Sequence, residues 1–367
     1  MIYLDYSATT KPSKKVLNVF NKVAINNYAN ANSNYDIAYA SKNIIEKSIN
    51  IIKNSLKLND KDIIFTSGAS EANNTVIKGL SQLTKKRHII TTFFEHSSVL
   101  APISYLQTKG FKVDFVACLE DGRVDIENLK SLINEDTFLV SICAVNSEIG
   151  IRNQIEEIGL ILKGYEDIYF HSDITQCLGK NNIDLTNIDF ATCSAHKIYG
   201  IKGIGALIKK ENNKLMPLIN GGKSTTIYRS GTPQTALIAS FAEAIKNIQI
   251  EDFNYVKNLN EYLQNKLKKI KGVCINSNNK CIPHILNISI NGINSNITQK
   301  YLNNKQIYIS TKTACATDNN KSLSVYKLTN DEEKSISSIR ISLSHQTTKK
   351  EINTLLIALK ELINENN

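Results

Sequence analysis

Residues 189–208 read DFATCSAHKIYGIKGIGALI, and this stretch is the most informative about the architecture. Two short apolar runs, 189–193 and 204–208, flank a polar segment that contains a lysine and a glycine-rich turn. Parallel neighbours in a sheet need a crossover of about a dozen residues or more, and the intervening segment is too short for a crossover helix. We therefore expect two buried strands here, one of them antiparallel to its neighbours.

Similar apolar runs recur upstream, and segments of helical periodicity separate most of them. The helical period is clear over 97–108 and 153–163, and the apolar runs are 62–66, 87–92, 112–117, 137–143 and 168–171. Strands that alternate with helices favour a mostly parallel sheet covered on both faces. The sequence thus predicts an α/β fold with a mostly parallel seven-stranded sheet covered by helices.

The C-terminal third has a different pattern. A long helix is expected over 235–272, followed by strands at 284–290 and 336–342 and by a final helix that contains Leu355. Between the strands, 311–335 is polar and weakly periodic, which predicts a long loop, and loops of that length are usually functional or disordered.

The length of 367 residues exceeds the usual size of a single hydrophobic core. Together with the change of pattern, this length predicts two domains linked by a helix. We expect a large domain over 14–255. A smaller α/β domain would be formed by 1–13 and 256–367.

The formal net charge of +10 raises the question of nucleic-acid binding. Only five of the 44 basic residues are arginine, and the abundance of Lys, Asn and Ile indicates a coding bias. The chain has no run of five or more like charges and no basic helix with interleaved aromatic residues. We therefore expect no direct contact with nucleic acid.

The seven cysteines form no CxxC pair. Neither a disulfide framework nor a zinc-ribbon spacing is present, so we expect no metal site. The first residues, MIYLDY, lack the regions of a signal peptide, and no apolar run approaches the ~18 residues of a membrane span. These features predict a cytoplasmic protein with reduced thiols and no membrane association.

Polar residues follow most of the apolar runs directly. In an open α/β sheet, ligands bind at the edge where the carboxyl ends of the strands lie. TSGASE at 66–71 is a glycine turn into a helix, whose free N–H groups suit a phosphate. Other runs lead into Glu95-His96, Asn146-Ser147, the segment from Asp173 to Gln176, and the segment from Ser194 to Lys197.

Most of these features have an ordinary structural explanation when each is taken alone, as a helix cap or a satisfied polar side chain. Lys197 is harder to explain in that way, because a buried lysine must be paired or used chemically. Together the residues supply what pyridoxal phosphate requires. They offer a lysine for a Schiff base, an acid for the pyridinium nitrogen and a phosphate site.

These residues lie within a longer ordered series of motifs. The series is YLDYSATT (3–10), TSGASE (66–71), EH (95–96), VNSEIG (145–150), HSDITQ (171–176), SAHK (194–197), RSGT (229–232), PHILN (283–287), AC (314–315) and SSIR (337–340). With these motifs the chain resembles the cysteine desulfurases, which are fold type I pyridoxal-phosphate enzymes of the class V aminotransferase group. The resemblance runs nearly from end to end.

The resemblance implies a role for each matched residue. Lys197 would carry the cofactor and then act as the acid–base group. Asp173 would hold the pyridinium proton, Gln176 would bond the ring hydroxyl oxygen, and His96 would stack on the ring. Arg340 would clamp the carboxylate of the substrate with its planar fork.

Further contacts are implied for the phosphate, the ring and the substrate. The resemblance implies that the phosphate is held by Ala69, Ser70, Ser194 and His196, with Thr232 contributed by the other subunit of a homodimer. The asparagine that meets the ring in the family corresponds to Ser147, with Asn146 one place earlier, and Asn30 would help to bind the substrate.

Cys315 is the residue that best distinguishes between the possible activities of this chain. A free cysteine is usually a small buried apolar residue, but Cys315 opens the polar segment at 311–335, where a thiol would be exposed and able to ionise. The resemblance implies that it attacks the sulfur of cofactor-bound L-cysteine, which leaves alanine and an enzyme persulfide. The long loop is typical of members that pass sulfur to iron–sulfur scaffold or tRNA thiolation proteins.

The chain also departs from the family pattern. The departures are NANSNY (30–35) in place of Asn-Pro-Ser-Ser-x-His, Ser147 in place of asparagine, KSTTI (223–227) and TKT (311–313). They leave two alternatives open. One is a selenocysteine lyase or small-molecule aminotransferase on the same fold, and the other is a non-catalytic sulfur-relay or RNA-binding partner protein.

Overall fold

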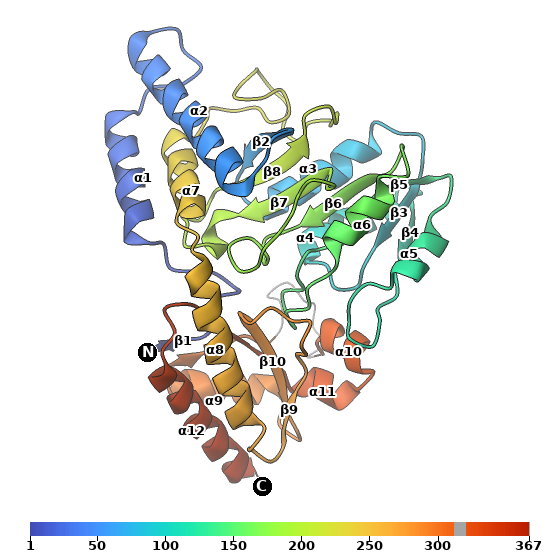
Figure 1. Cartoon of the computed structure of the whole chain (residues 1–367), viewed down its shortest axis with the longest axis vertical. Helices are drawn as coiled ribbons and strands as arrows, with labels where there is room; N and C mark the ends of the chain where they lie inside the picture. Colours follow the sequence, from blue (N-terminus) through green and yellow to red (C-terminus); the bar gives the residue numbers. More distant parts are fainter. Residues whose placement is uncertain (312–320, 367) are drawn as a thin grey trace.

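The main sheet occupies the upper part of the computed structural model (Figure 1), which describes residues 1–311 and 321–366. Its strand order is β2-β8-β7-β6-β5-β3-β4. The strands are β2 (Lys61–Thr66), β3 (His88–Thr91), β4 (Lys112–Phe115), β5 (Thr137–Ser141), β6 (Tyr169–Asp173), β7 (Phe190–Ser194) and β8 (Gly205–Lys210). β8 is antiparallel to both neighbours and the other pairs are parallel, which confirms the predicted fold class.

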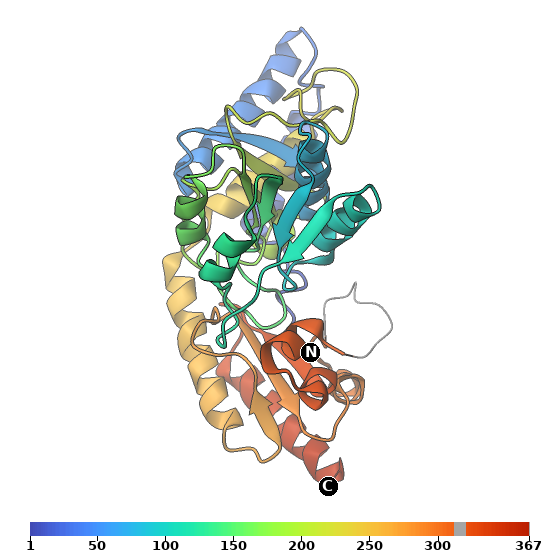
Figure 2. The same ribbon diagram turned by 90° about the vertical axis from the view of Figure 1, so that its right-hand side faces the viewer.

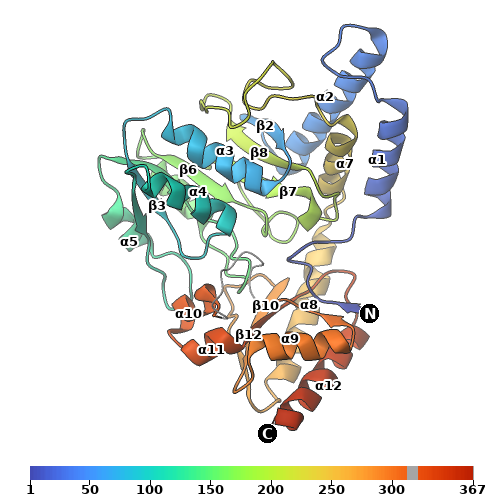
Figure 3. The ribbon, with the colours of Figure 1, turned by 180° about the vertical axis from the view of Figure 1, so that it is seen from behind.

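Helices cover both faces of this sheet. α3 (Ala69–Ser81) and α4 (Ser97–Gln107) cover the face shown in Figure 3. The face shown in Figure 1 is covered by α2 (Asp36–Leu56), α6 (Ile155–Leu162) and α7 (Thr235–Lys246), and the remaining helices of this part are α1 (Lys14–Asn26) and α5 (Ile126–Leu132). Because side chains alternate along a strand, Ile64 packs in one layer and Ile63 and Phe65 in the other.

A smaller unit lies below the main sheet (Figure 2). Its elements are β1 (Ile2–Tyr3), α8 (Ile250–Leu267), β9 (Val273–Ile275), β10 (Ile285–Ile290), α9 (Ser295–Asn304), β11 (Ile307–Tyr308), α10 (Leu323–Thr329), α11 (Glu332–Ser337), β12 (Ser338–Ser342) and α12 (Lys349–Asn366). β10 is antiparallel to β9 and β12, and β1 pairs with β11. One apolar cluster joins Leu4 to residues between Val256 and Ile363. The domain limits 14–255 and 256–367 stay a prediction.

The helix predicted over 235–272 is divided into α7 and α8. Asn247 is the C-cap of α7, and its side-chain amide also donates to the carbonyl of Glu243 at 2.7 Å. In the ranges that the structure describes, no helix is both long and apolar enough to cross a membrane.

The loop predicted over 311–335 is wrong from Leu323 onward, because α10 and α11 lie there. Each helix begins at a polar cap: Ser322 accepts the N–H of Val325, and Asp331 accepts that of Lys334. These capping residues made the segment read as loop. Val325 provides the missing apolar anchor by packing against Ile149 and Ile151 of the large unit.

Candidate active site

A cavity of about 550 Å³ opens at the carboxyl ends of β6 and β7, beside the first turn of α3. Asp173 is the last residue of β6 and Ser194 the last residue of β7, as expected for a site at this edge of the sheet. Nine of the residues predicted to bind the cofactor line the cavity, and they are Ala69, Ser70, His96, Ser147, Asp173, Gln176, Ser194, His196 and Lys197.

Lys197 lies in a single 3₁₀ turn, Ala195–Lys197, which directly follows β7. Its Nζ donates to the carbonyl oxygens of Ser7 at 2.5 Å and Ala8 at 2.8 Å. Burial first and the charge of Arg340 second lower the pKa of Lys197 to about 8, against the opposing charges of Asp173 and Asp5. A larger fraction of the amine is therefore uncharged at neutral pH than for an ordinary lysine, and the uncharged amine is the nucleophile.

The lowered pKa of Lys197 predicts how cofactor loading depends on pH. We expect the rate at which the apoprotein takes up pyridoxal phosphate to rise about tenfold per pH unit at low pH and to level above pH 8, where the free amine dominates. Absorbance after rapid mixing, at fixed cofactor concentration, measures this rate. A rate that still climbs at about pH 10 would indicate an ordinary lysine instead.

Asn73 links the acid of the site to its histidine. It is fully buried, and its Nδ2 donates to Asp173 Oδ2 and to Ser98 Oγ, each at 2.9 Å. Asp173 Oδ1 accepts the N–H of Thr175 at 2.9 Å. Each carboxylate oxygen thus has one fixed partner and one remaining lone pair, so Asp173 can still accept a hydrogen bond from a protonated ring nitrogen.

His96 caps α4 and is held in one tautomer. Its Nδ1 accepts the backbone N–H of Ser98 at 3.1 Å, so the proton of the neutral ring lies on Nε2. Burial lowers the pKa of His96, and the charge of Lys197 adds to this effect while Asp173 opposes it. The ring is therefore neutral at physiological pH and suited to stacking.

The position of Asn73 predicts a stability effect. Asn73→Ala removes donors from Asp173 and Ser98 in a buried place, and should lower the free energy of unfolding of the apoprotein by about 1–3 kcal/mol. Asn74→Ala is the matched control, because Asn74 is only partly buried and its side-chain amide donates to the carbonyl of Ser70, within its own helix. Asn74→Ala should change the free energy of unfolding by no more than about 0.5 kcal/mol. Urea titration of both variants measures the difference, and equal effects would contradict the assignment.

The phosphate end of the cavity is built from backbone and neutral donors. α3 begins behind Gly68, and no described side chain caps it, so the first N–H groups of the helix are available for an anion. Ser194 and His196 also line this cavity. Burial lowers the pKa of His196 to about 4, with Lys197 and Lys202 adding to the shift, so this ring is a neutral donor.

Gly205 allows the close approach that shapes this end. A Cβ atom added there would lie 2.4 Å from the carbonyl oxygen of Cys193 and 2.7 Å from the Cα of Gly68. Any other residue would therefore push the turn before α3 away from β8. The glycine-rich stretch after Lys197 fixes where the anion-binding turn lies.

The donor set therefore fits pyridoxal phosphate. Lys197 can hold the aldehyde carbon, Asp173 the ring nitrogen, and the α3 turn the phosphate. The cofactor supplies an electron sink for charge that develops on the bound amino acid. The resemblance of this constellation to what pyridoxal phosphate requires was visible in the sequence, and the structure brings these residues together.

Asn146 and Arg340 lie next to the cavity rather than in its wall. The Asn146 amide donates to the carbonyl of Phe94 and its oxygen accepts the N–H of Glu148, so the side chain holds the loop that carries Ser147. Arg340 donates to the Ser147 carbonyl at 2.8 Å and pairs with Asp5 at 2.7 Å. Its buried Nε has no partner within the described residues. The roles predicted for both residues stay predictions.

Two other predicted residues, Thr232 and Asn30, lie outside this cavity. Thr232 is exposed and lines a neighbouring cavity of about 280 Å³, which shares Ser67 and Gly203 with the cofactor cavity. Asn30 is exposed, and its Oδ1 accepts the N–H of Asn32. Cys315 lies outside the described residues. The roles predicted for these three residues stay predictions.

Sequence reasoning missed Asn73, Cys143 and the carbonyls that hold Lys197. Cys143 lines the cavity, and burial, with the charges of Glu95 and Asp173, raises its pKa well above that of a free thiol. It directly ends the apolar run 137–143, so the strand-edge rule could have found it. Asn73 lies within the first turns of α3 and carries no comparable signal.

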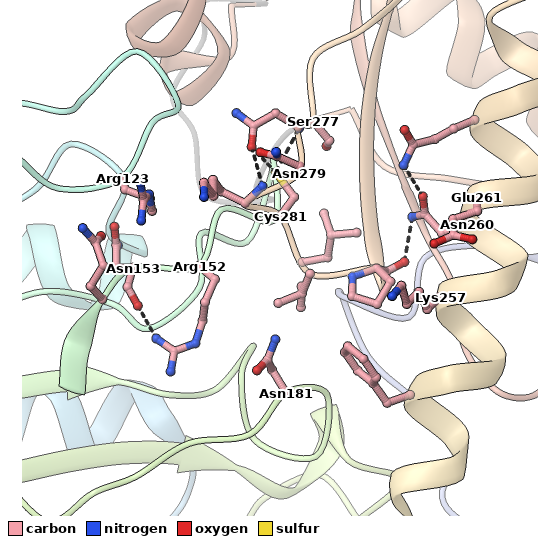
Figure 4. Close-up of a pocket in the computed structure, with 18 of the residues that line it drawn as sticks. Arg123, Arg152, Asn153, Asn181, Lys257, Asn260, Glu261, Ser277, Asn279 and Cys281 are labelled. Atoms are coloured by element: carbon pink, nitrogen blue, oxygen red, sulfur yellow. Dashed lines mark hydrogen bonds between the residues drawn. The ribbon is translucent and has the colours of Figure 1, made fainter. Parts of the chain in front are cut away.

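Another cavity, of about 740 Å³, lies between the two units (Figure 4). Two of the five arginines line it, but both are paired with carboxylates, Arg123 with Asp121 and Arg152 with Glu156. Within the described chain, none of the residues predicted to bind cofactor or substrate lines this cavity. The chemistry therefore belongs to the cavity around Lys197.

Comparison with known proteins agrees with this site. A model of the aminotransferase class-V family matches residues 2–355. The cysteine desulfurase IscS of Buchnera aphidicola subsp. Baizongia pistaciae is 36% identical over 99% of this chain and 93% of its own length, and the mitochondrial cysteine desulfurase of Arabidopsis thaliana is 35% identical over 96% and 80%.

Solved structures agree as well. A NifS-like protein superimposes with a TM-score of 0.93 at 30% identity over 99% of both chains. A structure titled SspA in complex with cysteine has a TM-score of 0.84 at 30% identity, over 95% of this chain and 100% of that one.

The chain therefore belongs to the class-V aminotransferase family, the pyridoxal-phosphate enzymes whose fold and lysine site it shares. Within that family it falls among the cysteine desulfurases. The resemblance seen in the sequence and the cofactor expected from it are both confirmed.

Proposed function

We propose that this enzyme removes sulfur from L-cysteine and holds it on Cys315 before an acceptor protein takes it. The C–S bond of the substrate breaks and an S–S bond forms, so L-cysteine and the Cys315 thiol give L-alanine and a Cys315 persulfide. The observation that carries the proposal is the Lys197 amine, with its pKa lowered to about 8, in one cavity with Asp173 and a neutral His96. The cysteine desulfurase relatives and the cysteine-bound SspA structure support the choice of substrate.

The residues of the cavity have separate tasks in this reaction. Lys197 moves protons at the substrate carbons, because its amine can both accept and donate near neutral pH. Asp173 keeps a proton on the ring nitrogen. Arg340 holds the substrate carboxylate, and its pairing with Asp5 indicates that the substrate competes for one of its N–H groups.

The other cysteines are poor competitors for the sulfur. Burial raises the pKa of five of the six described ones, namely Cys118, Cys143, Cys177, Cys193 and Cys281. The thiolate is the nucleophile, so a raised pKa lowers their reactivity. The sixth, Cys274, lies in β9 of the smaller unit and does not line the cofactor cavity, which leaves Cys315 as the favoured acceptor.

Exposed apolar side chains around the connection between α1 and α2 support a homodimer. Ile25 is 73% exposed, Tyr28 78% and Ile37 56%, and Ile227 on the loop before Thr232 is 65% exposed. Several large exposed apolar side chains in one part of the chain favour an interface, and a second copy of this chain would supply its own Thr232. A light-scattering mass equal to one chain would contradict the dimer.

The proposal also includes the protein that accepts the sulfur from Cys315. Chains named IscS and NifS among the relatives support an iron–sulfur scaffold as acceptor, and a tRNA thiolation protein is the other candidate. The cytoplasmic location stays part of the proposal.

The experiment is a product balance with the holoenzyme. Incubation with L-cysteine, without a reductant, should give alanine and protein-bound sulfane sulfur in equal amounts, and a thiol reductant should then allow repeated turnover. Formation of a keto acid in the absence of any thiol acceptor would identify an aminotransferase. Turnover of selenocysteine alone would identify a lyase, and either result would contradict the proposal.

A further inference from the structure

Lys180 is a second buried amine beside the cofactor cavity. It is 7% exposed, and its Nζ donates to the side-chain oxygen of Gln176 at 2.7 Å. Together with Lys197 it lines a separate cavity of about 380 Å³. Among the described residues, no carboxylate forms an ion pair with it. A lysine buried in this way costs free energy, which indicates a role beyond solubility.

The hydrogen bonds connect Lys180 to Lys197 through one amide. Gln176 receives the Lys180 bond on Oε1 and donates from Nε2 to the Ser7 carbonyl at 2.9 Å. The same carbonyl accepts Nζ of Lys197 at 2.5 Å. A chain of hydrogen bonds therefore runs from Lys180 through Gln176 to the Ser7 carbonyl oxygen. Lys197 donates to the same oxygen.

Lys180 decides which end of the Gln176 amide faces the cavity. With the amide reversed, its NH₂ group would face the donating Nζ of Lys180, and its oxygen would face the Ser7 carbonyl oxygen. Both pairs would repel, whereas the observed orientation satisfies both. Because Nε2 carries two hydrogens and one is used by Ser7, the other is free for an oxygen in the cavity that Gln176 lines.

We infer that Lys180 is a positioning residue, which fixes the Gln176 amide so that its N–H faces the ring oxygen of the bound cofactor. An N–H that donates to that oxygen makes the oxygen a weaker hydrogen-bond acceptor, so the oxygen binds the neighbouring proton less strongly. Lys180 would therefore set the pH at which bound cofactor changes its protonation. The inference rests on the cofactor site of the proposed enzyme, and not on the fate of the sulfur.

The test is a pH titration of the visible absorbance of the holoenzyme, which needs no cysteine. Lys180→Met, which lacks the donor, should raise the midpoint by about one pH unit. Lys180→Gln keeps an N–H donor without the charge and should stay within about 0.3 unit of the parent. Lys61→Met is the matched control, because Lys61 is also a buried lysine and bonds to the remote Ile188 carbonyl. It should not move the midpoint.

A double-mutant cycle separates positioning from a direct effect of charge. In a Gln176→Ala background, Lys180→Met should add less than about 0.3 unit, because the amide that it orients is gone. A shift of the same size in both backgrounds would mean that Lys180 acts through space, and would overturn the inference. No shift in the parent background would overturn it too.

A variant that fails to fold also gives a clear result. Lys180→Ala is measured beside Lys180→Met, since the smaller side chain is easier to accommodate. If neither variant retains cofactor while Lys61→Met does, Lys180 serves folding and the inference is wrong. Because the titration precedes any turnover, a failed desulfurase reaction and a failed titration are distinguishable.

Discussion

Replacing Lys197 by alanine is expected to lower the release of alanine from L-cysteine by about 10³-fold or more. The variant loses the amine that carries the cofactor and the group that moves protons at the substrate. It also loses the hydrogen bonds from Nζ to the carbonyl oxygens of Ser7 and Ala8. Amino-acid analysis of the product, with excess pyridoxal phosphate present, measures the loss.

Lys202→Ala provides the matched control for that experiment. Lys202 lines the same cavity but is exposed, so its removal should change turnover by no more than about threefold. A Lys197→Ala protein that kept more than about a tenth of the parent rate would contradict the assignment of Lys197.

Cys315→Ala is expected to keep the absorbance of bound cofactor. Its rate of alanine release from L-cysteine should fall by about 100-fold. The cofactor site would be intact, because the described residues that line it are unchanged, but the sulfur would have no thiolate to receive it. Alanine and absorbance are measured on the same sample. A variant that released as much alanine as the parent would exclude Cys315 as acceptor.

Cys143→Ala is the control for this second experiment. Cys143 lies in the cavity wall, yet its pKa is raised well above that of a free thiol by burial first and by Glu95 and Asp173 after it. Its thiolate is therefore scarce, and the variant should keep alanine release within about threefold of the parent.

The residues that follow strands could be predicted from the sequence, because strand position fixes them. Asp173 and Ser194 end β6 and β7, and Lys197 follows within one turn, so the edge rule alone brings them together. The antiparallel β8 was predictable for the same kind of reason, since the segment before it is too short for a crossover.

Other features depend on tertiary contacts that the sequence does not display. Asn73 meets Asp173, 100 residues away in the chain, and Lys197 meets the Ser7 carbonyl from 190 residues away. Pairings of this kind follow from how the elements pack, which one sequence does not reveal. Helices α10 and α11 were missed because short capped helices with few apolar residues resemble loops.

The central claim is that the sulfur of L-cysteine comes to rest on Cys315. The direct measurement is to incubate the holoenzyme with L-cysteine, trap the thiols, digest the protein and locate the extra sulfur by peptide mass. We expect a mass increase of one sulfur on the peptide that contains Cys315. The same increase on the peptide of Cys143, or of any other cysteine, would contradict it.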